Sequence, residues 1–98
     1  MPIRMRVYHQ GKETLVAAAD ADIVGKTFRE GKFKIEVGKF YEGEVVSEEA
    51  FVDHLKLATI GNFVGTETVD AAIRAGFVTD GGILWIDGVP HAQFVLMM

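Results

Sequence analysis

Cationic side chains suited to binding phosphate are concentrated in one short stretch of the sequence. Residues 26–39 contain five of the chain's ten lysines and arginines against two glutamates. Another group lies along the first predicted strand, where Arg4, Arg6 and Tyr8 share one face. Cations that hold phosphates beside a ring that stacks on a base are the combination used by RNA-binding sheets. The sequence therefore predicts an RNA-binding surface made of Arg4, Arg6, Tyr8, Lys26, Phe28, Arg29, Lys32 and Lys34.

The charge balance restricts where such a surface can lie. The net charge is -4, which disfavours binding of nucleic acid over the whole molecule. Residues 1–39 carry eight cations against five carboxylates, whereas residues 40–98 carry two against nine. The N-terminal half is thus the expected contact, and it is contiguous if a strand at residues 33–37 pairs with the strand at residues 3–9. The alternative is a solvated, salt-bridged surface.

A second hypothesis places a ligand pocket around a histidine near the C-terminus. His91 and Gln93 share a face of a predicted strand, where an imidazole can act as an acid or base. Together with Asn62 they form the predicted ligand-binding set of a small binding protein or enzyme. The chain has no cysteine, and its single serine, Ser47, caps a helix. We therefore predict no catalytic residue and favour a non-enzymatic protein.

The sequence contains no pattern typical of a metal or cofactor site. The histidines at positions 9, 54 and 91 lack metal-ligand spacing with one another or with a nearby carboxylate. Residues 61–66, which include two glycines, could offer backbone amides to an anion before a helix, although an ordinary connection is favoured. We expect neither metal nor cofactor.

The apolar segments suggest partners other than RNA. The apolar stretch Phe94–Met98, or the sheet edge near Pro90, could contact a protein partner or a second copy of the chain. The longest apolar runs have five residues, too few to cross a bilayer, and the first residues do not resemble a signal peptide. We expect a cytoplasmic protein without membrane contact.

Two hairpins are predicted by turn residues between apolar segments. Gly11-Lys12 supplies a two-residue turn that places Val16 opposite Val7. Asp87-Gly88 predicts a second hairpin in which Ile86 pairs with Val89. In this register the proline that follows is tolerated if its side of the strand is an edge.

Helices are expected in the middle of the chain. Ser47 caps the clearest one, with Phe51 and Leu55 on its buried stripe, and a second begins at Thr66 and stops at Gly76. Asp20 is expected to cap a single helical turn. Strands at both ends and helices between them predict an α+β fold. We expect one domain over residues 1–98, a two-layer sandwich of a mostly antiparallel sheet and two main helices.

Four stretches, in this order and spacing, resemble a known archaeal family. They read Gly25-Lys26-Thr27-Phe28-Arg29-Glu30-Gly31, Glu44-Val45-Val46-Ser47, Ala58-Thr59-Ile60-Gly61-Asn62 and Gly88-Val89-Pro90-His91-Ala92-Gln93. The family is domain of unknown function 424, and the resemblance covers nearly the whole chain. It implies a small cytoplasmic domain from an archaeon, and it supplies no reaction, substrate or catalytic residue. It adds weight to Arg29 and His91 as site residues.

Overall fold

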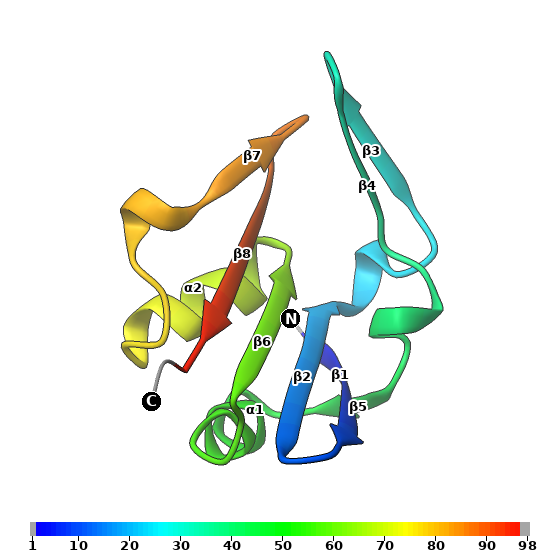
Figure 1. Ribbon diagram of the computed structural model, residues 1–98. Helices are drawn as coiled ribbons and strands as arrows, with labels where there is room; N and C mark the ends of the chain where they lie inside the picture. The colour runs from blue at the N-terminus through cyan, green and yellow to red at the C-terminus, as the bar shows by residue number, and fades with distance from the viewer. Residues whose placement is uncertain (1, 97–98) are drawn as a thin grey trace.

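A six-stranded sheet forms the centre of the molecule (Figure 1). The structure is a computed structural model that describes residues 2–96. The sheet contains β1 (Ile3–Gln10), β2 (Glu13–Asp20), β5 (Glu44–Val46), β6 (Ile60–Val64), β7 (Leu84–Ile86) and β8 (Val89–Val95). Their order is β5-β1-β2-β6-β8-β7, and every neighbouring pair is antiparallel except β2 with β6. The predicted α+β fold with a mostly antiparallel sheet is confirmed.

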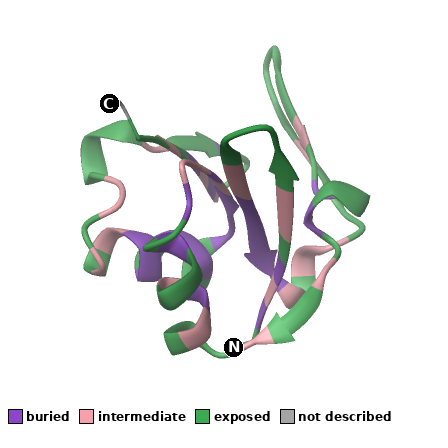
Figure 2. Cartoon of the chain, turned by 60° about the horizontal axis from the view of Figure 1, so that its bottom comes forward, coloured by how far each residue is buried: buried purple, intermediate pink, exposed green. Residues whose placement is uncertain are grey.

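Two helices cover one face of this sheet, which we call the helix face. They are α1 (Glu48–Leu55) and α2 (Thr66–Arg74). Ser47 begins α1 as predicted, because its Oγ accepts a hydrogen bond of 3.0 Å from the amide of Ala50. Phe51 of α1 meets Phe63 of β6 edge to face, 5.5 Å between ring centroids, in the main core. Figure 2 shows the buried residues between the helices and the sheet.

The opposite face of the sheet, which we call the outer face, carries a smaller two-stranded sheet and short 3-10 turns. The small sheet is the hairpin of β3 (Thr27–Glu30) and β4 (Phe33–Glu36). The turns are Ala21–Ile23 and Lys39–Tyr41, and a third, Asp80–Gly82, precedes β7. The condition for one contiguous basic surface, pairing of residues 33–37 with the first strand, is not met, since β1 lies between β2 and β5. The hairpin is a separate unit.

Both predicted turns have the expected register. Val7 lies opposite Val16 in the first hairpin, and Ile86 lies opposite Val89 in the last. The edge expected near Pro90 is not there, because β8 lies between β6 and β7. Pro90 is tolerated for another reason. It lies just beyond the last register pair of β6 and β8, Val64 with His91, and its carbonyl, which proline retains, accepts from the amide of Gly65 over 2.9 Å.

Candidate nucleic-acid interface

The β3–β4 hairpin projects from the sheet and is held at both ends (Figure 1). At its base the amide of Gly25 donates to the carbonyl of Val37 over 2.6 Å, and the amide of Val37 donates to the carbonyl of Lys26 over 2.9 Å. Near its tip, Glu30 Oε1 accepts from the amide of Asp87 in the β7–β8 turn over 2.6 Å. These contacts fix the position of the hairpin relative to the sheet.

The inner side of the hairpin is apolar and packs on the outer face of the sheet. Phe28 and Ile35 are register partners, and both pack against a buried cluster that contains Val37, Tyr41 and Val64. This packing half-buries Phe28, which sequence analysis assigned to stacking on a base. A second ring of this segment, Phe33, was not among the predicted stacking residues, and it is 53% exposed beside the turn. Phe33 alternates with charged residues, and its exposure could not be inferred without the sheet order.

The other side of the hairpin presents cations to solvent. Arg29 and Lys34 are exposed and lie directly opposite each other. Like charges in this arrangement repel and destabilise a hairpin. Glu36 relieves part of the repulsion, because its carboxylate lies 2.7 Å from the Lys34 ammonium. The hydrogen bond and charge of Lys34, with a smaller effect of Arg29, lower the pKa of Glu36.

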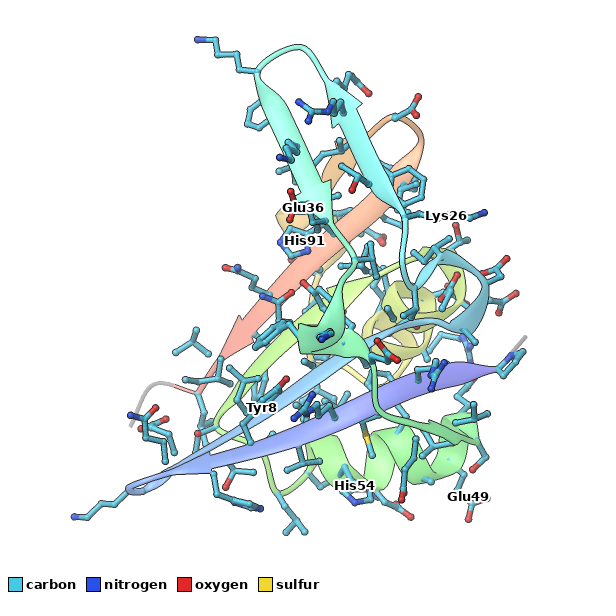
Figure 3. The ribbon with its side chains drawn as sticks, turned by 90° about the vertical axis from the view of Figure 1, so that its right-hand side faces the viewer. Tyr8, Lys26, Glu36, Glu49, His54 and His91 are labelled. Atoms are coloured by element: carbon cyan, nitrogen blue, oxygen red, sulfur yellow. The ribbon has the colours of Figure 1, made fainter. Side chains whose placement is uncertain are left out.

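Two further predicted cations lie at the ends of the hairpin. Lys32 occupies the turn after Gly31, whose φ of +60° favours glycine. Lys26 precedes β3, and its exposed side chain extends away from the body of the protein (Figure 3). The structure therefore brings four of the predicted RNA-binding residues, Lys26, Arg29, Lys32 and Lys34, onto one projecting arm.

The predicted arginines of β1 have structural partners in the segment that follows the hairpin. Arg4 Nε donates to the carbonyl of Gly43 over 3.0 Å, and Arg6 Nη1 donates to the carbonyl of Lys39 over 3.3 Å. Both arginines thus hold residues 39–43, which we call the strap, against β1. Arg6 remains exposed, whereas Arg4 is half-buried.

Tyr8 also binds the strap. Its hydroxyl donates to the carbonyl of Phe40 over 2.8 Å, and the two rings stack with centroids 5.2 Å apart. The guanidinium carbon of Arg6 lies 5.1 Å from the centroid of the Tyr8 ring. The Tyr8 ring already has neighbours, so it is less suited than Phe33 to take a base by itself.

The predicted ligand set is divided by the structure. Asn62 and Gln93 are register partners on the outer face, with His91 next on the same strand. His91 and Gln93 line a cavity of about 440 Å³ together with Gly82, Leu84 and Ala92. Asn62 is not part of this lining, and its Oδ1 accepts from the hydroxyl of Tyr41 instead.

Two ring side chains of the outer face, His91 and Tyr41, lie in defined surroundings. His91 Nδ1 lies 3.0 Å from the carbonyl oxygen of Phe63, which only accepts, so Nδ1 carries a proton and Nε2 faces away from this bond. Burial raises the pKa of Tyr41 to about 12. Tyr41 was overlooked in the sequence because a lone tyrosine among glycines and glutamates gives no sign of burial.

The start of α2 is filled by a side chain of the protein itself. Asp20 is buried at the end of β2, and its carboxylate accepts from the amides of Glu67 and Thr68 over 3.1 and 2.8 Å. The hydroxyl of Thr68 adds a third bond of 2.8 Å. Asp20 makes no cap bond to the short helical turn that follows it, contrary to the prediction. The anion considered for residues 61–66 is thus an internal carboxylate.

The apolar C-terminal segment is divided between core and surface. Phe94 is half-buried and meets Phe77 edge to face, 5.3 Å between centroids. Val95 and Leu96 are exposed. The rest of the segment predicted to bind a partner, Met97 and Met98, lies outside the described residues.

The comparison with protein families identifies the family of this chain. Residues 8–97 match the family described as "Protein of unknown function (DUF424)". The chain belongs to this family. The fold of this DUF424 protein resembles the crystal structure of an uncharacterized conserved protein from Methanopyrus kandleri, with a TM-score of 0.83 and 17% identity. The match covers 100% of this chain and 96% of the other. No curated protein matches the sequence.

Neither a metal-binding cluster nor a membrane-spanning helix is found in the part of the DUF424 chain that the structure describes. Among residues 2–96, no three histidine or carboxylate side chains are grouped closely enough to hold a metal ion. Over the same residues, no helix has the length and apolar character needed to cross a membrane. The hairpin and the outer face remain the candidate sites.

Proposed function

We propose that this DUF424 protein is a non-enzymatic RNA-binding module whose β3–β4 hairpin contacts RNA phosphates. The observation that supports this most strongly is the pair of exposed cations, Arg29 and Lys34, placed directly opposite each other on a projecting arm. Their repulsion weakens the isolated hairpin, and a phosphate placed between them would convert it into attraction.

The charge distribution supports the same interpretation. Residues 26–39 have a net charge of +3 because they carry five cations and two carboxylates, so the rest of the chain has a net charge of -7. An acidic body repels a polyanion while the arm attracts it, which orients the protein on its ligand. A surface evolved for solubility alone does not require such segregation.

An exposed ring next to the turn of the hairpin favours unpaired RNA. Phe33 is 53% exposed and follows Lys32, on the same side of the hairpin as Ile35 and opposite to the side of Lys34. Unpaired bases stack on aromatic side chains while neighbouring cations follow the backbone, and this mode tolerates many sequences. We therefore expect single-stranded segments to bind better than uniform duplex.

Salt-dependent binding of a labelled single-stranded uridine RNA tests the proposal. For a single strand, each phosphate contact contributes about 0.7 to the slope of log affinity against log salt. The triple variant R29Q/K32Q/K34Q should therefore lower the slope by about 2 between about 50 and 200 mM salt. The unfolding midpoint should change little, because the substitutions remove both the like-charge pair of Arg29 with Lys34 and the exposed ion pair of Lys34 with Glu36.

A matched pair of single substitutions controls for charge alone. Lys32→Gln and Lys56→Gln each remove one exposed ammonium, but Lys56 lies just after α1, on the helix side, 3.5 Å from Asp53. We expect weaker binding from Lys32→Gln and unchanged binding from Lys56→Gln. No RNA binding by the native protein, or an equal effect of the two variants, would overturn the proposal.

A further inference from the structure

A second feature of the outer face lies beside the β1–β2 turn, away from the tip of the hairpin. It is a cavity of about 300 Å³ lined by Tyr8, Gln10, Glu13, Leu15, Phe40 and Ile60. This volume is at the lower end of the range for small-molecule pockets. Figure 3 shows Tyr8 on the same side of the sheet as the hairpin. The cavity and the basic arm can therefore face one ligand.

The walls of the cavity suit a flat, partly aromatic group. Leu15 and Ile60 are register partners on β2 and β6 and form an apolar floor. Phe40, held by its stack on Tyr8, provides an aromatic wall and is 40% exposed. An apolar floor beside an aromatic ring is the usual environment of a bound base.

The polar rim of the cavity consists of an amide and a carboxylate, and the carboxylate favours some bases over others. Gln10 and Glu13 are register partners at the turn. The hydroxyl of Thr59 donates to Glu13 Oε2 over 2.7 Å, which fixes the carboxylate; Oε1 and the second lone pair of Oε2 can accept from a ligand. A carboxylate only accepts hydrogen bonds, so it favours a base with donors side by side. Guanine presents two such donors, N1–H and N2–H, whereas adenine, cytosine and uracil each present one donor group on that edge.

Positive charge lies next to the aromatic wall. The Arg6 guanidinium stacks on Tyr8, and the exposed Lys39 immediately precedes Phe40 in the strap. Both cations are exposed beside residues that line the cavity, and the strap follows β4 after residues 37 and 38. The cavity therefore combines an apolar slot, a carboxylate rim and a cationic entrance.

We infer that this cavity binds an unpaired guanine base of the RNA that the hairpin holds. The inference rests on the proposed function and gives it a base preference. The carboxylate of Glu13 accepts from the guanine edge, Phe40 stacks beside the ring, and Arg6 contacts the adjoining phosphate.

The test compares two single-stranded RNAs, one of uridines only and one with a single internal guanosine. Native protein should bind the guanosine RNA roughly tenfold more tightly, the effect of one charged hydrogen bond. Glu13→Gln should abolish this ratio, because an amide nitrogen cannot accept. Glu44→Gln removes another exposed carboxylate, on β5, which β1 separates from β2, and should preserve the ratio. Both variants should shift overall affinity for uridine RNA alike.

A second measurement separates the two proposals. Guanosine 5′-monophosphate is titrated into protein labelled at its methyl groups, with adenosine 5′-monophosphate as the control, and the signals of Leu15 and Ile60 are followed by NMR. Equal binding of the two RNAs by native protein would overturn the guanine site and leave the hairpin proposal standing. If neither RNA binds but the guanosine nucleotide shifts both methyl signals in native protein and not in Glu13→Gln, the cavity is supported and RNA binding is overturned. No binding and no shifts would overturn both.

Discussion

Substitution of Asp20 tests the packing that joins the two layers of the fold. Asp20 is 6% exposed, and its carboxylate accepts three hydrogen bonds from Glu67 and Thr68 at the start of α2. Gly65, the residue that begins this helix, offers no side-chain cap. The carboxylate thus satisfies amides that would otherwise be unpaired, and its negative charge interacts favourably with the helix dipole.

The expected cost follows from these three bonds. Asp20→Asn retains one acceptor oxygen but turns an NH₂ group toward a backbone amide and removes the charge. A lost bond to a charged group costs about 1.5–3 kcal/mol, and loss of the charge at the start of the helix adds about 0.3–1 kcal/mol, so we expect a total of about 2–4 kcal/mol. That is a large part of the roughly 5–15 kcal/mol by which domains of this kind are stable.

Urea unfolding at neutral pH, followed by circular dichroism, measures this cost. Asp22→Asn is the matched control, because Asp22 is an exposed carboxylate two residues away. We expect Asp20→Asn to lower the unfolding free energy and Asp22→Asn to leave it within about 0.5 kcal/mol, as for ordinary surface substitutions. If the two variants unfold alike, Asp20 does not cap α2 in solution.

Two further predictions concern the same packing and the outer face. Gly65→Ala should lower the thermal unfolding midpoint far more than Gly76→Ala: both glycines have positive φ, +107° and +85°, but only at Gly65 would a Cβ collide, 2.5 Å from Cγ of Asp20. Equal losses in a thermal melt would contradict this. In the folded chain the pKa of Tyr41 is raised to about 12, so above pH 10 the unfolded chain loses this proton first. The free energy of unfolding should therefore fall between pH 10 and 12, by up to about 1.4 kcal/mol per pH unit. Tyr41→Phe should remove this part of the pH dependence, as measured by urea unfolding at each pH. If the native protein and the variant lose stability in parallel, burial of Tyr41 is excluded as the cause.

The elements that could be predicted from the sequence are those determined by neighbouring residues. The first hairpin follows from alternation around a glycine turn, and α1 follows from Ser47 and the apolar stripe after it. Strand β6 could not be predicted in this way, because Gly61 and Asn62 are poor strand formers. Its glycine has a reason that only the fold shows: a Cβ at Gly61 would lie 2.3 Å from Cζ of Phe63. The ring of Phe63 occupies the space of the missing side chain.

The candidate site was predictable in composition but not in arrangement. The excess of cations in residues 26–39 is a property of the sequence. The order of the strands decides which of these cations lie together. The alternation of polar and apolar residues does not determine that order. The same is true of the cavity beside Phe40, because its walls come from β1, β2, β6 and the strap, segments far apart in the sequence.

The separation of the hairpin from β1 changes how substitutions of the two cation groups must be interpreted. Had β4 paired with β1, Arg4 and Lys34 would belong to one sheet and any loss of binding could be assigned to lost phosphate contacts. Instead Arg4 holds the carbonyl of Gly43, so Arg4→Gln removes one of the bonds that hold the strap beside the cavity. Weaker binding by that variant would therefore not establish a phosphate contact. Arg29 has no such role in holding the strap, which makes the hairpin the place where loss of charge and loss of structure can be separated.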